Sequence, residues 1–203
     1  MNTNKTDKQP PRMARGRRRS IFAAGACVLL ALPRLATPHG IGIVNPAIAM
    51  PDNLPLLLND GKHVTLGNLL HERRTLLQLM FTGCSETCPL QGALFAALGA
   101  KFATALNGKN QMLSVSIDPM DDPRSLSSWL TRFGAGRGWI AAVPSSHGID
   151  LIRTLLQGGR AGLGTHSSQV FFIDESQRLI WRTEDFPSTE IVVQIGKRNG
   201  WVT

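Results

Sequence analysis

The sequence lacks an apolar run long enough to cross a bilayer as a helix. The apolar run near its start extends over twelve residues, from Ile21 to Leu32, and is broken by Pro33 and Arg34. A membrane-spanning helix needs about 20 such residues. The rest of the chain also lacks internal repeats and low-complexity stretches. Its length of 203 residues therefore predicts one folded domain with an N-terminal appendage.

The folded part of the chain lacks an excess of charge of either sign. The whole chain carries a formal charge of +8, with 22 Lys and Arg against 14 Asp and Glu. Eight of the basic residues and one acidic residue lie within residues 1–34, which leaves fourteen basic and thirteen acidic residues in the remainder. The basic character thus belongs to the N-terminus. No nucleic-acid partner is predicted for the folded part.

The N-terminus is typical of an export signal. Three arginines, Arg17–Arg19, directly precede the short apolar run, as the positive region of a secretory signal does. Residues 18–22 (RRSIF) resemble a twin-arginine signal. We read Cys27 as an ordinary apolar residue of this segment and not as a lipid-attachment site, because the apolar run continues after it.

The sequence leaves open whether the N-terminal segment is a cleaved signal or an uncleaved membrane anchor. Ala47–Ala49 fits the small-x-small pattern of a cleavage site, whereas Ile41–Val44 together with the earlier apolar run would suit an uncleaved anchor. We therefore divide the chain into residues 1–49, an export signal or anchor, and residues 50–203, the folded domain. The domain is expected in the periplasm, soluble or anchored to the inner membrane, where disulfides survive.

The folded domain alternates predicted strands and helices. Continuous apolar runs such as residues 75–81 (TLLQLMF) are typical of strands that are buried on both faces. From residue 75 on, the order βαβαβαββα predicts an α/β fold with a central, mostly parallel sheet flanked by helices, and the final hairpin and helix indicate a thioredoxin-like ending. The strands are expected at residues 64–66, 75–81, 111–117, 139–143, 169–174 and 179–183, and the helices at 69–70, 90–106, 123–133, 149–156 and 188–198.

Two cysteines lie between a predicted buried strand and a predicted helix. Cys84 and Cys88 have the spacing C-x-x-x-C. In an exported protein such a pair most often forms a structural disulfide. However, ligands collect at the carboxyl ends of strands in α/β sheets, and a helix N-terminus lowers the pKa of a thiol, so the position also favours a reactive or metal-binding pair.

The other candidate residues are less distinctive. His166 follows a glycine-rich stretch and precedes a predicted strand, but a lone histidine is usually a surface or core residue. Asp118 ends a strand beside the expected site, where aspartate is also a common turn former. The remaining histidines are expected on the surface or in loops; they are His39, His63, His71 and His147.

Three motifs lie in order along about residues 55–200. They are Phe81–Pro89, Ser114–Pro119 with Asp121 or Asp122 and Pro123, and Thr165–Ser167 leading to Phe172–Asp174. They resemble the aromatic-Thr-x-Cys-Pro-x-x-Cys-Pro loop, the Ser-Ile-Asp-Pro-x-x-Asp-x-Pro segment and the His-Ser pair before a Leu-Ile-Asp strand of the Sco/SenC family, copper chaperones that assemble respiratory oxidases. Ser85 replaces the family's proline after the first cysteine.

The resemblance implies a copper site and a function. It makes Cys84, Cys88 and His166 the metal ligands and gives Asp118 a supporting role. Two thiolates and an imidazole suit Cu(I), and the family also implies Cu(II). The implied function is a metallochaperone that delivers copper to the two-copper centre of a respiratory cytochrome oxidase. Its implied partner is the copper-bearing oxidase subunit or another copper chaperone.

Two enzymatic alternatives remain. A thiol–disulfide oxidoreductase acting on oxidase cysteines would need Cys84 and Cys88 but not His166. A peroxide-reducing thioredoxin relative ranks last, since the usual attack-site pattern of that class is not evident in the sequence.

Overall fold

The structure, a computed structural model, describes residues 41–106, 108–157, 168–183 and 186–201. All of them belong to one compact unit, residues 37–203. His39 and His166, together with the twin-arginine region and Cys27, lie outside the described residues.

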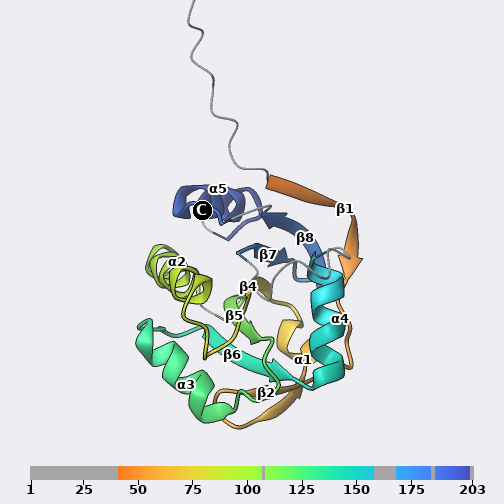
Figure 1. The fold of residues 1–203 in the computed structure, drawn as a ribbon. Helices are drawn as coiled ribbons and strands as arrows, with labels where there is room; N and C mark the ends of the chain where they lie inside the picture. Colours follow the sequence, from red (N-terminus) through yellow and green to blue (C-terminus); the bar gives the residue numbers. More distant parts are fainter. Residues whose placement is uncertain (1–40, 107, 158–167, 184–185, 202–203) are drawn as a thin grey trace, which may run out of the picture. The chain divides into compact units, whose positions relative to one another are not determined.

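An eight-stranded sheet forms the centre of this unit (Figure 1). Its strands are β1 (Ile41–Ala49), β2 (Pro55–Leu58), β3 (His63–Thr65), β4 (Arg74–Met80), β5 (Asn110–Ser116), β6 (Trp139–Pro144), β7 (Val170–Ile173) and β8 (Arg178–Thr183). The helices are α1 (Leu66–Leu70), α2 (Thr87–Lys101), α3 (Pro123–Arg132), α4 (Ser146–Gln157) and α5 (Thr189–Arg198). The strand order is β1-β8-β7-β4-β5-β6-β2-β3.

The predicted α/β class is confirmed, but the sheet is mixed and not mostly parallel. Only the β4–β5 and β5–β6 pairs are parallel. The other neighbouring pairs are antiparallel. The cause lies in the connections: the hairpins β2–β3 and β7–β8, together with β1, extend the three parallel strands in the antiparallel sense on both sides.

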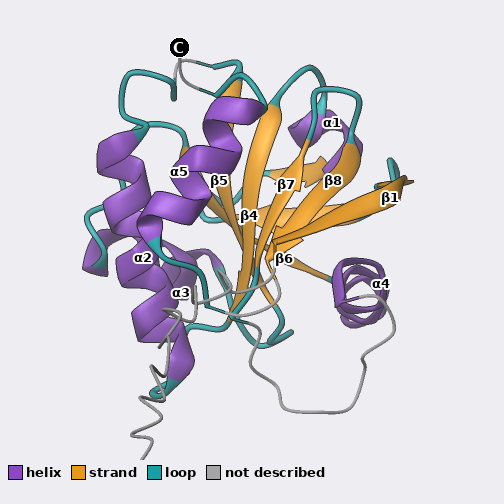
Figure 2. Ribbon diagram, turned by 90° about the horizontal axis from the view of Figure 1, so that it is seen from above, coloured by secondary structure: helices purple, strands orange, loops and turns teal. Residues whose placement is uncertain are grey.

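Helices cover both faces of the sheet. Helices α2, α3 and α5 lie on one face, and α1 and α4 lie on the other (Figure 2). Successive residues of β4 therefore enter different cores: Leu76 belongs to the cluster under α2, and Leu77 belongs to the cluster under α4. This double burial explains why the β4 sequence is apolar without alternation.

Two strands were not expected from the sequence, and helices α1, α2 and α4 each begin about three residues earlier than predicted. β2 begins with Pro55 and has only four residues, so it gives little periodic signal. β1 spans the residues that the sequence analysis assigned to the N-terminal segment, and it pairs with β8. Helix α2 begins at Thr87 and ends at Lys101, earlier than the predicted 90–106, so that Cys88 lies in its first turn.

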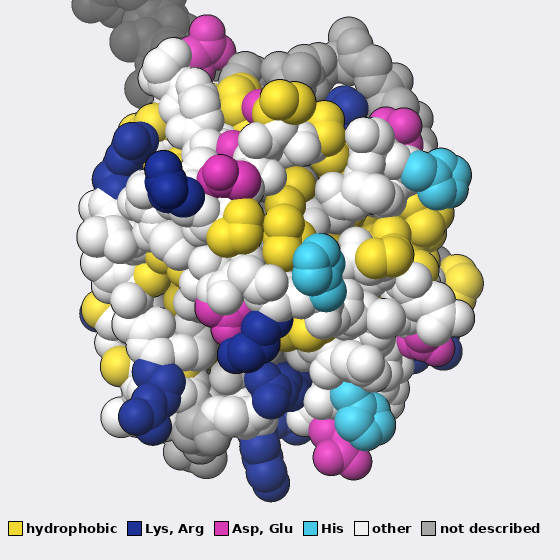
Figure 3. Space-filling model, turned by 90° about the horizontal axis from the view of Figure 1, so that it is seen from below, with side chains coloured by type: hydrophobic (Ala, Val, Ile, Leu, Met, Phe, Trp, Pro, Cys, Tyr) yellow, Lys and Arg dark blue, Asp and Glu magenta, His cyan; other side chains and the backbone are white. Residues whose placement is uncertain are grey.

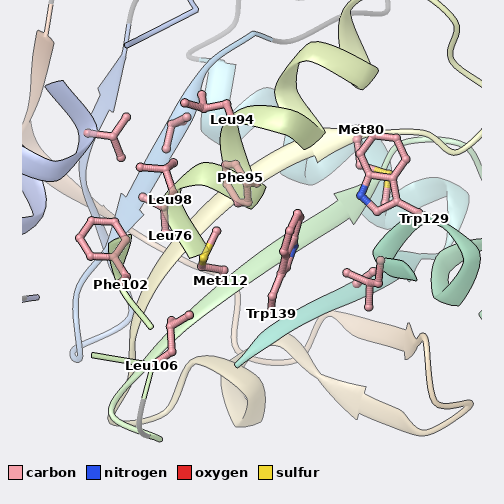
Figure 4. Close-up of a cluster of buried hydrophobic side chains, with 14 of the residues drawn as sticks. Leu76, Met80, Leu94, Phe95, Leu98, Phe102, Leu106, Met112, Trp129 and Trp139 are labelled. Atoms are coloured by element: carbon pink, nitrogen blue, oxygen red, sulfur yellow. The ribbon is translucent and has the colours of Figure 1, made fainter. Parts of the chain in front are cut away.

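The core under α2 is built from interlocking aromatic and aliphatic side chains (Figure 4). The ring centroids of Phe95 and Trp139 are 5.7 Å apart. Those of Trp129 and Phe133 are 4.6 Å apart. The first contact fixes α2, which carries Cys88, against β6, and the second lies within α3 and its C-cap.

One face of the domain carries separate groups of basic side chains and no continuous basic patch. In the view of Figure 3, Lys and Arg gather in separate groups, with acidic and uncharged side chains between them. Among the described residues, no helix is long and apolar enough to cross a membrane.

Two glycines of α2 provide a test of its packing. A Cβ on Gly92 would lie 2.5 Å from the Phe133 ring, whereas a Cβ on Gly99 would come no closer than 3.9 Å to its nearest neighbour, Met112 Sδ. We expect Gly92→Ala to lower the free energy of unfolding by about 1–3 kcal/mol through overpacking. Gly99→Ala should raise it by up to about 1 kcal/mol, because alanine favours the helix. Urea unfolding of both variants measures the two effects. Equal effects of the same sign would contradict this packing.

Candidate metal site

The two cysteines lie together at the carboxyl end of β4. The chain turns immediately after the strand, where the Cys84 N–H donates to the Phe81 carbonyl at 3.2 Å. The Cys88 N–H then donates to Cys84 Sγ at 3.4 Å. Both side chains are buried, with exposed fractions of 5% and 3%, and both are thiols, not a disulfide. The two cysteines therefore lie close together without a bond between their sulfurs, and Cys84 lies in the turn before α2 and not on the helix.

Burial reverses the expected effect on the thiol pKa. The first turn of a helix lowers a thiol pKa when the thiol is exposed. Here burial, aided by the hydrogen bond with Cys84, raises the pKa of the Cys88 thiol to about 12. Cys88 is thus protonated at neutral pH in the metal-free protein, and a metal ion that binds there as to a thiolate must displace that proton.

The third predicted ligand, His166, lies outside the described residues, whereas the chain that follows it is described from residue 168 onward. Val170, four residues further on, pairs with Gln78, two residues before the end of β4. The chain thus enters β7 at the end of β4 that leads into the cysteine turn. Within the described part of the chain, no group of three or more His, Cys, Asp and Glu side chains is placed to hold a metal. His63, His71 and His147 are exposed, as predicted.

Asp118 has a local contact in the structure. Its Oδ1 accepts the Met120 N–H at 2.9 Å, which closes the turn after β5. This contact corresponds to the turn-forming role that the sequence left open. A supporting role toward a metal stays a prediction.

A neighbouring carboxylate, Asp121, holds the cysteine turn. It is 8% exposed. Its Oδ2 accepts the Thr82 N–H at 3.0 Å and the Ser116 hydroxyl at 2.5 Å. Its Oδ1 accepts the Thr82 hydroxyl and, at 3.4 Å, the Ser125 hydroxyl. The carboxylate therefore joins the start of the cysteine turn to the end of β5 and the first turn of α3. The sequence showed Asp121 as part of a motif but gave it no role.

Helix α3 begins on the next residue of this loop. Asp122 accepts the Ser125 N–H at 2.7 Å, and Ser125 Oγ accepts the Asp122 N–H at 2.9 Å. This capping box fixes the start of α3 and thereby the position of Ser125 beside Asp121.

The Asp121 contacts predict a specific loss when the carboxylate becomes an amide. Asp121→Asn replaces one acceptor oxygen by a donor, which leaves a hydroxyl or N–H of Thr82 or Ser116 without its acceptor. We expect a loss of about 1–3 kcal/mol in the free energy of unfolding and faster modification of Cys84 and Cys88 by a thiol reagent in the native protein.

Asp122→Asn is the matched control, because asparagine caps a helix as well as aspartate does. It should change neither measurement appreciably. If Asp121→Asn behaved like this control in both assays, the carboxylate would not hold the turn.

Comparisons with known proteins identify similar sequences and structures. Residues 54–138 match the family model described as SCO1/SenC. None of the curated protein sequences matches the chain. Among solved structures, the chain is similar to a SCO1/SenC family lipoprotein from Bacillus anthracis, with 22% identity over 77% of this chain and 99% of the other and a TM-score of 0.59.

Two further structures extend the likeness. BsSco, described as a member of the Sco family of cytochrome c oxidase assembly proteins with a disulfide switch, is 20% identical over 79% of this chain and 99% of its own, with a TM-score of 0.62. Yeast Sco1 with copper bound is 17% identical over 75% of this chain and 90% of its own, with a TM-score of 0.59. These likenesses confirm the thioredoxin-like fold. By this match, residues 54–138 of the chain belong to the SCO1/SenC family.

Proposed function

We propose that this protein is a copper-binding metallochaperone that delivers copper to the two-copper centre of a respiratory cytochrome oxidase. The observation that carries the proposal is the pair of buried thiols at the carboxyl end of β4, joined by the hydrogen bond from Cys88 N–H to Cys84 Sγ. Membership of the family and the copper-bound state of its relative yeast Sco1 support it.

The proposed ligands are Cys84, Cys88 and His166. Two sulfurs and one imidazole form a soft donor set that suits Cu(I), with Cu(II) as the second state of the cargo. Three protein ligands leave a coordination position to which a ligand of the acceptor, an oxidase subunit or another chaperone, can bind during transfer. We assign Asp118 a supporting role through the turn that it closes beside the cysteines.

A second candidate function is thiol–disulfide exchange on the cysteines of the oxidase. The same thiol pair favours it, and the disulfide switch described for BsSco is consistent with such chemistry. Exchange requires an attacking thiolate. Burial raises the pKa of Cys88 to about 12, so its thiolate is scarce at neutral pH, and Cys84 would have to be the attacking thiol. We place exchange second because the similar structure of yeast Sco1 is described with copper bound.

We further propose that residues 1–49 direct export to the periplasm, where the domain is soluble or anchored to the inner membrane. The arginine-rich start followed by a short apolar run supports an export signal.

Copper binding by the reduced full chain tests the ligand assignment. We expect one copper ion per chain in the wild type. Cys84→Ser, Cys88→Ser and His166→Ala should each weaken binding by more than the roughly 10–100-fold that follows loss of an outer-shell partner. Elemental analysis after desalting and competition against a Cu(I) chelator provide the two measurements.

Cys27→Ser is the control, because it removes the remaining cysteine and should leave the affinity unchanged. Full copper retention in Cys84→Ser or Cys88→Ser would refute the metal site. Wild-type affinity in His166→Ala, with thiol exchange intact, would make the oxidoreductase the better proposal.

The export proposal has its own test. Replacement of Arg18 and Arg19 by lysine keeps the charge but removes the pair that a twin-arginine receptor recognises. We expect the double variant to remain in the cytoplasm, as measured by cell fractionation. A Lys5→Arg, Lys8→Arg variant serves as the control and should be exported normally. Normal export of the double-lysine protein would favour the general secretory route.

A further inference from the structure

One of the four methionines in the described part of the chain lies at the surface. Met50, Met80 and Met112 are buried, with exposed fractions of 4% or less, whereas Met120 is 85% exposed. Its side chain belongs to neither apolar core cluster and is not among the partly buried side chains that pack against them. Met120 therefore contributes almost no buried apolar area to the stability of the fold.

The backbone around Met120 is held in a turn beside the cysteine turn. β4 and β5 are parallel neighbours, and Met80 at the end of β4 pairs with Ser116 at the end of β5. The turns that follow these two strands therefore lie side by side. Asp118 Oδ1 accepts the Met120 N–H at 2.9 Å, and the Asp118 carbonyl accepts the Asp121 N–H at 3.1 Å.

The residue after Met120 links this turn to the cysteine turn directly. Asp121 Oδ2 accepts the N–H of Thr82, which lies two residues before Cys84, at 3.0 Å. Met120 thus has a fixed backbone next to the cysteine turn and a side chain that is exposed to solvent. Because this side chain is unbranched and has three rotatable bonds, it can take up several positions beside the turn.

The two thiols are much less accessible than the thioether of Met120. Cys84 and Cys88 are 5% and 3% exposed, so a donor molecule that carries copper does not meet both sulfurs at the surface. A thioether, like a thiolate, is a soft ligand that selects Cu(I). It also carries no proton that the metal ion has to displace. The turn after β5 therefore places an accessible soft ligand next to a buried pair of soft ligands.

We propose that Met120 Sδ is a transfer ligand for Cu(I), which binds the ion first and passes it to Cys84 and Cys88. The inference rests on the proposed function. A bond between copper and its donor breaks as the copper–Sδ bond forms, and the copper–Sδ bond breaks as the two cysteine sulfurs bind. The thiol protons pass to water, and copper stays Cu(I) throughout. Because Met120 is absent from the loaded site, it changes the rate of copper exchange and not the affinity.

The exchange of Cu(I) between the reduced full chain and a colorimetric Cu(I) chelator, followed without oxygen, tests this proposal. Met120→Leu keeps an apolar side chain of similar volume and removes the sulfur. We expect uptake and release of copper both to slow about tenfold, which corresponds to a rise of about 1.4 kcal/mol in the barrier. The affinity measured at equilibrium should equal that of the wild type.

Two further variants separate the sulfur from its surroundings. Leu90 is also an exposed apolar residue, at 62%, and it lies on α2 two residues after Cys88. Leu90→Ala is the matched control for an effect of the apolar surface and should leave the exchange rate unchanged. Met120→His restores a copper ligand at the same position and should recover most of the lost rate, because imidazole also binds copper.

The outcomes are distinguishable. Slower exchange in Met120→Leu at unchanged affinity, with recovery in Met120→His, supports the proposal. A wild-type rate or a weaker affinity in Met120→Leu, equal slowing in Leu90→Ala, or no recovery in Met120→His overturns it and leaves the copper site intact. Failure of the wild type to retain copper overturns the proposed function and this inference together.

Discussion

The arrangement of the site depends on the carboxylate of Asp121. A charged group with 8% exposure is stable only where several donors surround it, and Asp121 receives three hydroxyl groups and one backbone N–H. These donors come from the cysteine turn, the end of β5 and the start of α3. β4 and β5 are parallel neighbours, so their carboxyl ends already lie side by side. The carboxylate converts that proximity into a fixed position for the turn that contains Cys84.

The chemistry of the cysteine pair results from a competition between two effects. The first turn of α2 favours a thiolate through its N–H groups, whereas the apolar core under α2, of which Cys84 and Cys88 are part, favours the neutral thiol. Burial is the larger effect, since it raises the pKa of Cys88 to about 12. As a free thiol Cys88 is therefore a weak nucleophile, and a metal ion that binds it as a thiolate must displace its proton.

The sequence predicted those features that depend on local pattern. Double burial makes β4 a continuous apolar run, and the run located the strand, the turn after it and both cysteines. β2 was not predicted because it has only four residues and obtains part of its stability from pairing with β6, which lies far from it in the sequence. The antiparallel strand pairs at both edges of the sheet were not predicted for the same reason. Strand direction is fixed by tertiary pairing that periodicity does not record.

The roles of the three neighbouring carboxylates also depend on tertiary contacts that the sequence pattern does not show. Asp118, Asp121 and Asp122 lie within five residues, and sequence alone does not rank them. The folded turn after β5 gives each carboxylate a different role. Asp118 accepts a hydrogen bond from the nearby Met120 N–H, and Asp122 caps α3. Asp121 alone of the three is left to reach across to Thr82. Its role follows from the division of hydrogen-bond donors among neighbours, which exists only once the loop is folded.

Two contacts of different kinds hold the cysteine turn and the helix that follows it. The Asp121 carboxylate fixes the turn before α2 from the side of β5 and α3, and Gln91 Nε2, which donates to the Gln169 carbonyl at 2.9 Å, fixes α2 to the chain before β7. Neither contact involves a sulfur, so neither depends on the protonation state of a thiol. The cysteine turn therefore keeps its place in the metal-free protein through groups that are not among the proposed ligands.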